Sequence, residues 1–245
     1  MTTKVIPGML IAMVNADDVA REAATRVAKA ISESISERGR AVVALSGGET
    51  PKAAYAKLSQ AKIDWTKVEL LFVDERAVPP SSDRSNYHMV KTALIDPAKV
   101  PEENVHRMPA DASDLAQAAR EYAQVVTKVA GRGASIPQID VIVLGIGEDG
   151  HMASLFPGDP AIDVTDRHVI DVAADGAREA RLTLSAPIIE AARAAFILAG
   201  GAKKTPAREK GWAVSGQASA VPARIVRNIR GSVMWIIDKS AGGMG

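Results

Sequence analysis

Residues 139–158 read IDVIVLGIGEDGHMASLFPG, an apolar run that passes directly into a glycine-rich segment. The β-branched and aliphatic side chains from Ile139 to Leu144 are typical of a central parallel strand that is buried on both faces. The glycines that follow allow tight turns or a positive φ angle. They place Asp149 and His151 just beyond the carboxyl end of the strand, which is the edge where open α/β sheets bind ligands.

Strand and helix patterns alternate along the rest of the chain. Residues 17–38 carry apolar side chains at a spacing of four, with Asn15 as N-cap and Gly39 as stop, which predicts an amphipathic helix. Other strands are predicted at residues 41–45, 68–73, 141–144, 168–172, 194–199 and 233–237, and other helices at 51–58, 86–94, 113–129, 185–192 and 203–210. This alternation favours an α/β fold with a mostly parallel sheet and helices on both faces.

Composition limits the classes of partner and compartment. The chain has 245 residues, with 30 Lys and Arg against 29 Asp and Glu, so its net charge is +1. No nucleic acid or membrane partner is expected from this balance. The absence of cysteine excludes disulfides and thiolate chemistry, and a cytoplasmic location is the default. No linker divides the sequence, so residues 1–245 are interpreted as a single domain.

The apolar segment 5–14 near the start is interrupted by Pro7 and Gly8 and is far too short to span a membrane. We interpret it as a first strand or a lead-in to one. A short signal peptide is the alternative interpretation.

Residues 45–51, LSGGETP, are a candidate anion-binding loop. A predicted strand ends here in two glycines and two hydroxyl side chains, and a helix with an early proline follows. Exposed N–H groups at a helix start suit a phosphate, provided that Glu49 points away from it. The spacing matches neither a Walker loop nor GxGxxG, and an ordinary turn with a glycine pair is the alternative.

A second cluster of charge follows the strand predicted at 68–73, where Asp74, Glu75 and Arg76 occur in sequence. Two carboxylates beside a guanidinium can orient a hydroxylated ligand, and Arg76 can bind phosphate or stabilise an oxyanion. The alternative is a surface salt-bridge turn capped by Ser85.

His151 completes a third cluster, two residues after Asp149. A histidine acts as general base on water near neutral pH when a carboxylate fixes its tautomer. A lone histidine is more often structural, but all three clusters fall at predicted strand ends and so converge on one crevice. No metal is expected, because His151 has no second histidine at i+4 and the chain has no cysteine.

Segments that cover nearly the whole chain resemble, in order and spacing, the 6-phosphogluconolactonase family. They are LSGGETP (45–51), LLFVDERAVPP (70–80), SDRSNYHM (82–89), PEENVHRM (101–108) and LGIGEDGHMASLFPG (144–158). The resemblance implies a modified doubly wound α/β fold, shared with glucosamine-6-phosphate deaminase. It also implies cofactor-free hydrolysis of 6-phospho-D-glucono-1,5-lactone to 6-phosphogluconate in the oxidative pentose phosphate pathway, and we expect a monomer.

The resemblance also implies roles for individual residues. His151 matches the general base, and Asp149 matches the residue that orients it. The implied substrate-binding residues are Ser46, Gly47, Gly48, Thr50, Asp74, Arg76, Arg181 and Lys203. Whether Lys203 or Lys204 contacts the phosphate is open, because Pro206 fits only the first turn of a helix.

Two other functions are weighed against the lactonase. A deaminase of the same superfamily has a motif similar to AFNEP after its glycine–histidine pair, whereas this chain has ASLFP at residues 153–157. A sugar-phosphate sensor without catalysis would usually carry an output module, and the chain has no room for one. The lactonase is therefore the preferred interpretation.

Overall fold

The computed structural model describes residues 5–131, 133–176 and 178–241 of the chain. Within these residues, the larger sheet has six parallel strands, in the order β1 (Met9–Met13), β9 (Ser232–Asp238), β8 (Ala194–Ala199), β5 (Val141–Gly145), β2 (Ala41–Leu45) and β3 (Val68–Phe72). All of β2 and the first four residues of β5 are buried. The apolar runs in the sequence therefore become the central strands, as predicted.

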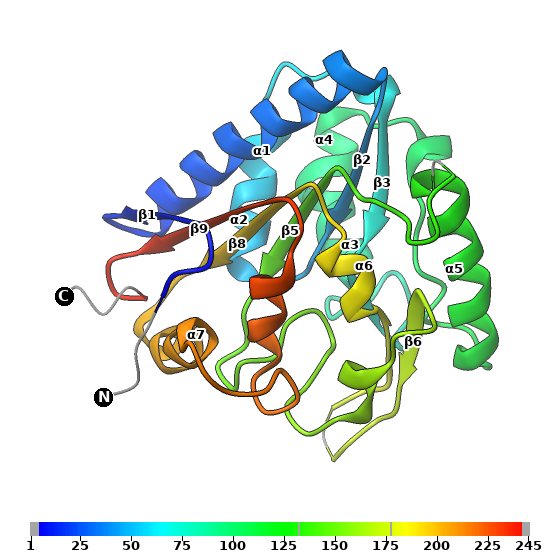
Figure 1. Cartoon of the computed structure of the whole chain (residues 1–245). Coiled ribbons are helices and arrows are strands. Elements are labelled where there is room, and N and C mark those ends of the chain that lie inside the picture. The colour runs from blue at the N-terminus through cyan, green and yellow to red at the C-terminus, as the bar shows by residue number, and fades with distance from the viewer. Residues whose placement is uncertain (1–4, 132, 177, 242–245) are drawn as a thin grey trace.

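Helices pack on both sides of this sheet. The α-helices of the described residues are α1 (Ala16–Arg38), α2 (Glu49–Leu58), α3 (Asn86–Val90), α4 (Asp96–Ala98), α5 (Leu115–Ala130), α6 (Ala186–Glu190) and α7 (Thr205–Trp212). α1 and α2 pack against each other and cover one face (Figure 1). α7 lies across β9 from α1, where Trp212 meets Trp235 edge to face with ring centroids 5.4 Å apart. The mostly parallel α/β fold is confirmed.

Short helical segments complete the connections. They are the 3-10 segments η1 (Trp65–Lys67), η3 (Glu102–Asn104), η4 (Pro160–Asp163), η5 (Ala202–Lys204) and η6 (Pro222–Asn228), and the π-helical turn η2 (Lys91–Ile95). The helix predicted at 86–94 is therefore divided, since α3 ends at Val90 and η2 continues it. The helix predicted at 203–210 starts later, at Thr205, with Pro206 in its first turn.

Local hydrogen bonds determine where helix α1 begins and ends. The side chain of Asn15 accepts a hydrogen bond of 3.0 Å from the backbone N–H of Asp18. At the other end Gly39 adopts a φ of 77° and donates its N–H to Ile35 at 2.9 Å. Both predicted caps are confirmed, because each satisfies backbone groups that the helix itself leaves without partners.

A second, antiparallel sheet was not expected. Its order is β4 (Asp74–Arg76), β7 (Arg181–Leu184) and β6 (Val169–Val172). The strand predicted at 168–172 exists, but it belongs to this smaller sheet rather than to the parallel one. Only Val73 separates β3 from β4, so the chain leaves the larger sheet where the DER segment begins. α5 packs against β6.

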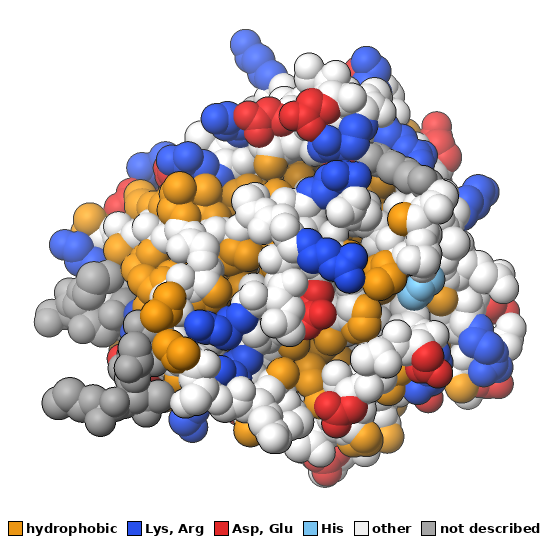
Figure 2. Space-filling model, viewed as in Figure 1, with side chains coloured by type: hydrophobic (Ala, Val, Ile, Leu, Met, Phe, Trp, Pro, Cys, Tyr) orange, Lys and Arg blue, Asp and Glu red, His pale blue; other side chains and the backbone are white. Residues whose placement is uncertain are grey.

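The strand order fixes where a ligand can enter. β2 pairs with β3 on one side and with β5 on the other, so the chain reverses its direction of winding between β2 and β5. At such a switch point the loops beyond the carboxyl ends of the strands separate and leave a crevice. Residues 46–48 follow β2, and residues 146–151 follow β5. On the face drawn in Figure 2, basic and acidic side chains are interspersed.

Candidate active site

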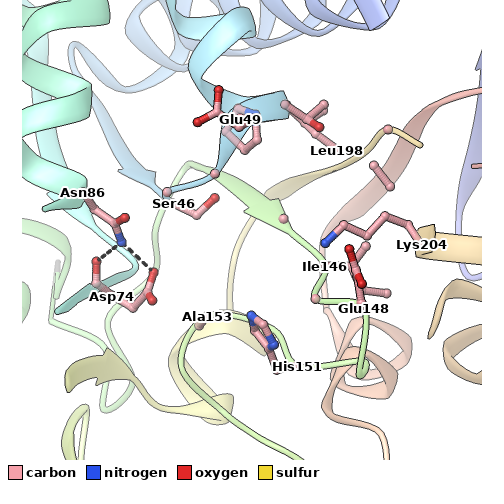
Figure 3. Close-up of a pocket in the computed structure, with 18 of the residues that line it drawn as sticks. Ser46, Glu49, Asp74, Asn86, Ile146, Glu148, His151, Ala153, Leu198 and Lys204 are labelled. Atoms are coloured by element: carbon pink, nitrogen blue, oxygen red, sulfur yellow. Dashed lines mark hydrogen bonds between the residues drawn. The ribbon is translucent and has the colours of Figure 1, made fainter. Parts of the chain in front are cut away.

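An open cleft of about 610 Å³ lies at this switch point. Its lining comes from the segments after β2 and β5, from β4, β7 and the start of α3, and from the chain that follows β8. Ser46, Asp74 and Asn86 lie on one side in Figure 3, His151 lies below them, and Lys204 with Glu148 lies on the other side. The three clusters predicted from the sequence therefore meet in one cleft.

The loop after β2 presents donors to the cleft. The backbone carbonyl of Ser46 accepts a 2.9 Å hydrogen bond from the buried hydroxyl of Tyr55, which anchors the loop. Gly48 has a φ of 108° and precedes the first turn of α2, a conformation that favours glycine. The Ser46 hydroxyl oxygen is buried and has no hydrogen-bond partner among the described residues. A buried, unpaired hydroxyl beside a helix N-terminus is suited to an anionic ligand.

A phosphate can bind at this loop only if Glu49 points away from it, and the structure meets this condition. Its side chain is exposed, and in Figure 3 its carboxylate points away from the middle of the cleft. The negative charge therefore lies away from the Ser46 side of the loop. Thr50, Gly47 and Gly48 also line the cleft.

Asp149 and His151 form a hydrogen-bonded pair in the loop after β5. The Asp149 Oδ1 atom lies 2.6 Å from His151 Nδ1 and also accepts the backbone N–H of His151 at 3.0 Å. Gly150, between them, adopts a φ of 93°. Gly147 leaves room for the imidazole, since a Cβ there would lie 2.1 Å from His151 Nδ1. The backbone N–H of His151 therefore holds the Asp149 carboxylate beside the imidazole, and Gly147 leaves the space that the pair needs.

The electrostatics of the pair suit a base. Burial alone would raise the pKa of Asp149, but the backbone N–H, charge and ring of His151 together lower it below the ordinary value. Asp149 is therefore ionised near neutral pH, and its Oδ1 accepts a hydrogen bond from the Nδ1–H of His151. This hydrogen bond leaves Nε2 with the lone pair, so the imidazole can take a proton from a molecule in the cleft.

The residues of the DER segment, 74–76, have different roles in the structure. The buried Glu75 accepts hydrogen bonds from Ser85 Oγ and from the backbone N–H groups of Asn86 and Tyr87, so it caps α3. Arg76 lines the cleft, donates Nη1 to the carbonyl of Arg84 at 2.7 Å, and has a buried Nε without a partner among the described residues. Glu75 thus stabilises the fold, and the adjacent Arg76 lines the cleft.

Asp74 is buried and is held by several side chains. Its Oδ2 accepts the hydroxyl of Ser154 at 2.6 Å and lies 3.8 Å from Arg181 Nη1, and Asn86 Nδ2 lies 3.3 Å from Oδ1. Figure 3 shows Asn86 and Asp74 joined in this way. Asp74 therefore ties together β4, β7, α3 and the loop that carries His151.

Arg181 begins β7 and is mostly buried. Burial lowers its pKa, an effect that the carboxylate of Asp74 opposes, and neighbouring Arg76 and Arg178 lower it further. Its Nε, like that of Arg76, has no partner among the described residues. A buried cation that lacks full compensation is stabilised by an anion in the cleft.

The basic residue on the far side of the cleft is Lys204. It is half-buried at the end of η5 and lines the cleft, whereas Lys203 is exposed and does not line it. The buried carboxylate of Asp238, at the end of β9, accepts the N–H of Gly201 at 2.9 Å and so holds the preceding turn. The structure therefore brings together every residue of the predicted set except Lys203.

Some residues that line or support the cleft were not predicted as site residues. Asn86 and Glu148 line it, and Ser154 supports it from full burial. The position of Ser154, three residues after His151, was the available signal in the sequence. Within residues 5–131, 133–176 and 178–241, no group of three or more His, Asp or Glu side chains is arranged to hold a metal ion. None of the helices in the same residues is long and apolar enough to cross a membrane.

Residues 14–235 match the family model described as glucosamine-6-phosphate isomerases/6-phosphogluconolactonase. The chain belongs to this family. A 6-phosphogluconolactonase of Synechocystis sp. is 36% identical over 231 residues, which cover 94% of this chain and 95% of that one. One of Rhizobium meliloti is 40% identical over 177 residues, 70% of this chain and 73% of that one.

Two solved structures superimpose on almost the whole chain. The 6-phosphogluconolactonase from Trypanosoma brucei has a TM-score of 0.85 at 26% identity and covers 98% of this chain and 99% of its own. A monomeric glucosamine-6-phosphate deaminase has a TM-score of 0.80 at 20% identity, covering 97% of this chain and 100% of its own. The second likeness concerns the fold alone.

Proposed function

We propose that this chain hydrolyses 6-phospho-D-glucono-1,5-lactone to 6-phosphogluconate, as a step of the oxidative pentose phosphate pathway. The observation that carries the proposal is the 2.6 Å contact between Asp149 and His151 in a cleft whose other walls present unpartnered donors. The relatives named 6-phosphogluconolactonase, at 36% and 40% identity, support the same reaction.

The phosphate of the substrate would bind to the cations of the cleft. Arg76 and Arg181 have buried Nε groups without partners among the described residues, and Lys204 lines the cleft on the side opposite Asp74. Ser46 Oγ and the N-terminus of α2 add neutral donors. Charge-assisted hydrogen bonds of this kind place the lactone ring against His151. Asp74 also lines the cleft, where it orients Ser154, Asn86 and Arg181 and can accept a hydroxyl of the substrate.

The chemical step requires a positioned water and one base. His151 Nε2 removes a proton as the water oxygen attacks the lactone carbonyl, and Asp149 stabilises the imidazolium that forms. The tetrahedral intermediate then expels the ring oxygen, which takes the proton back from His151. The ester is already activated, so no covalent intermediate is needed, and no cofactor or metal enters the step. The products are a carboxylic acid, which ionises, and a free hydroxyl.

We further propose that the enzyme acts as a monomer in the cytoplasm, where phosphorylated sugars are made. The support for a monomer is that the proposed base, its carboxylate partner and the proposed phosphate-binding cations are all present in this chain.

The test is a direct assay of lactone hydrolysis. Glucose-6-phosphate dehydrogenase generates the lactone in place, and loss of the lactone is followed above the spontaneous rate. We expect acceleration for the phosphorylated lactone and little for glucono-1,5-lactone, because the latter lacks the group that the cations bind. Ammonia release from glucosamine 6-phosphate should be absent. A protein that binds 6-phosphogluconate without accelerating hydrolysis would be a sensor and would contradict the proposal.

A further inference from the structure

The ring of Phe156 contacts the imidazole of His151 within the same loop. The two ring centroids lie 4.8 Å apart with an interplanar angle of 44°. Phe156 is only 8% exposed, so the contact lies in the interior at the edge of the cleft. Asp149 restrains His151 through one atom, Nδ1, and a single hydrogen bond leaves the ring free to rotate about that bond. A packed aromatic wall removes this freedom.

Phe156 is in turn held by a guanidinium from the connection between β6 and β7. Arg178 Cζ lies over the Phe156 ring at 3.8 Å from its centroid, and Arg181 Cζ lies 5.5 Å from the same centroid. Arg178 pairs with Asp159 at 3.3 Å, and the backbone N–H of Asp159 donates to the carbonyl of Phe156 at 3.1 Å. Each of Arg178, Asp159 and Phe156 thus contacts the other two.

We propose that Phe156 and Arg178 are positioning residues for His151. Phe156 fixes the plane of the imidazole, and Arg178 fixes Phe156 by stacking on its ring. Neither is assigned contact with the substrate, since neither lines the cleft. This inference rests on the proposed function for its kinetic consequence. Its structural consequence, the orientation of the imidazole, does not depend on any substrate.

The test compares Phe156→Leu and Arg178→Met with matched controls. Phe196→Leu removes the ring of another buried phenylalanine, in β8, that does not line the cleft. Arg107→Met removes a guanidinium that also pairs with an aspartate, Asp111, and lies 5.9 Å from an aromatic centroid. Urea unfolding of all four variants measures any general loss of stability.

Kinetics give the first readout. For Phe156→Leu we expect kcat to fall about tenfold to a hundredfold, because a small misplacement of a catalytic group has effects of this size. KM should stay unchanged, and Phe156→Tyr should restore most of kcat. Arg178→Met should lower kcat in the same direction, whereas both controls should keep the wild-type kcat.

The second readout needs no catalysis. NMR signals of the carbon-bound ring protons of His151, assigned with His151→Asn, should lose the ring-current shift of Phe156 in Phe156→Leu and move part of the way in Arg178→Met. If the variants show these shifts but the wild type does not hydrolyse the lactone, the proposed lactonase activity is refuted and the positioning of His151 is not. Unmoved His151 signals, or a rise in KM with unchanged kcat, would overturn the positioning role.

Discussion

Ser154 and Asp74 are joined by a 2.6 Å hydrogen bond between side chains that are 80 residues apart in the sequence. Both are buried, Ser154 completely. The bond connects the loop after β5, which carries His151, to β4, which carries Arg76. The base and the cations are therefore held at a fixed separation by groups that lie behind the cleft.

Replacing Ser154 with Ala should destabilise the protein. The change leaves a buried carboxylate without its shortest hydrogen bond, which costs about 1.5–3 kcal/mol for a charged partner. Urea unfolding measures this difference. Ser59→Ala, which removes an exposed hydroxyl bonded to Ala56, is the control and should change stability by less than about 0.5 kcal/mol. Equal unfolding midpoints for Ser154→Ala and wild type would mean that the hydrogen bond between Ser154 and Asp74 contributes nothing to stability.

Gly147→Ala should impair catalysis more than binding. Its Cβ would lie 2.1 Å from His151 Nδ1 and 2.6 Å from Asp149 Oδ1, so the pair must move. We expect kcat to fall about a hundredfold, with KM much less affected. Gly145→Ala offers a comparison two residues earlier, because the nearest atom to its Cβ is Gly47 O at 3.8 Å. Similar losses of kcat in both variants would contradict the steric explanation.

Lys204→Ala and Lys203→Ala form a matched pair of adjacent substitutions. Only Lys204 lines the cleft, so its loss should raise KM about tenfold or more, the value of a charge-assisted hydrogen bond. Lys203→Ala should leave KM near the wild-type value. Steady-state kinetics with the phosphorylated lactone measure both. If KM rises for Lys203→Ala and not for Lys204→Ala, Lys203 is the residue that contacts the phosphate.

Asp238→Asn should lower stability in a pH-dependent way. Burial raises the pKa of Asp238, but hydrogen bonds from Ser240, Ala241 and Gly201 lower it below the ordinary value of 3.8. Because the folded-state pKa is depressed, the carboxylate contributes stability above the ordinary value, and this contribution is lost as pH falls through the folded-state pKa.

Urea unfolding at a series of pH values measures this effect. The difference in free energy of unfolding between wild type and Asp238→Asn should be constant near neutral pH and shrink below pH 3.8. Asp166→Asn, at an exposed position, controls for the loss of one charge. If the difference in free energy of unfolding grows as the pH falls, the pKa of Asp238 is not lowered by folding.

The fold was largely predictable because burial leaves a strong pattern. β2 and β5 are apolar along their length, and the caps of α1 are local chemistry, so neither needs information from the rest of the chain. The smaller sheet was not predictable in this way. β4 is the three-residue polar segment DER, and the alternation of polar and apolar residues in β7 (RLTL) extends over four residues only, too few to predict a strand.

The candidate site was predictable where its residues follow predicted strands. Ser46 and His151 lie beyond β2 and β5, and the topology brings them together. The choice between Lys203 and Lys204 depends on where the turn of η5 ends, which two adjacent lysines do not reveal. Phe156 lies in the loop after β5 and Arg178 in the connection between β6 and β7, so their contact has no sequence signal.

The most direct test of the account is the turnover of His151→Asn beside wild type, measured on the lactone generated in place. Calorimetric binding of 6-phosphogluconate to both proteins shows whether the cleft remains intact. We predict that the variant binds the product but loses about 10²–10⁴-fold in kcat, the range expected for a general base. A variant that retains wild-type turnover would contradict the assignment of His151 as the base that activates water.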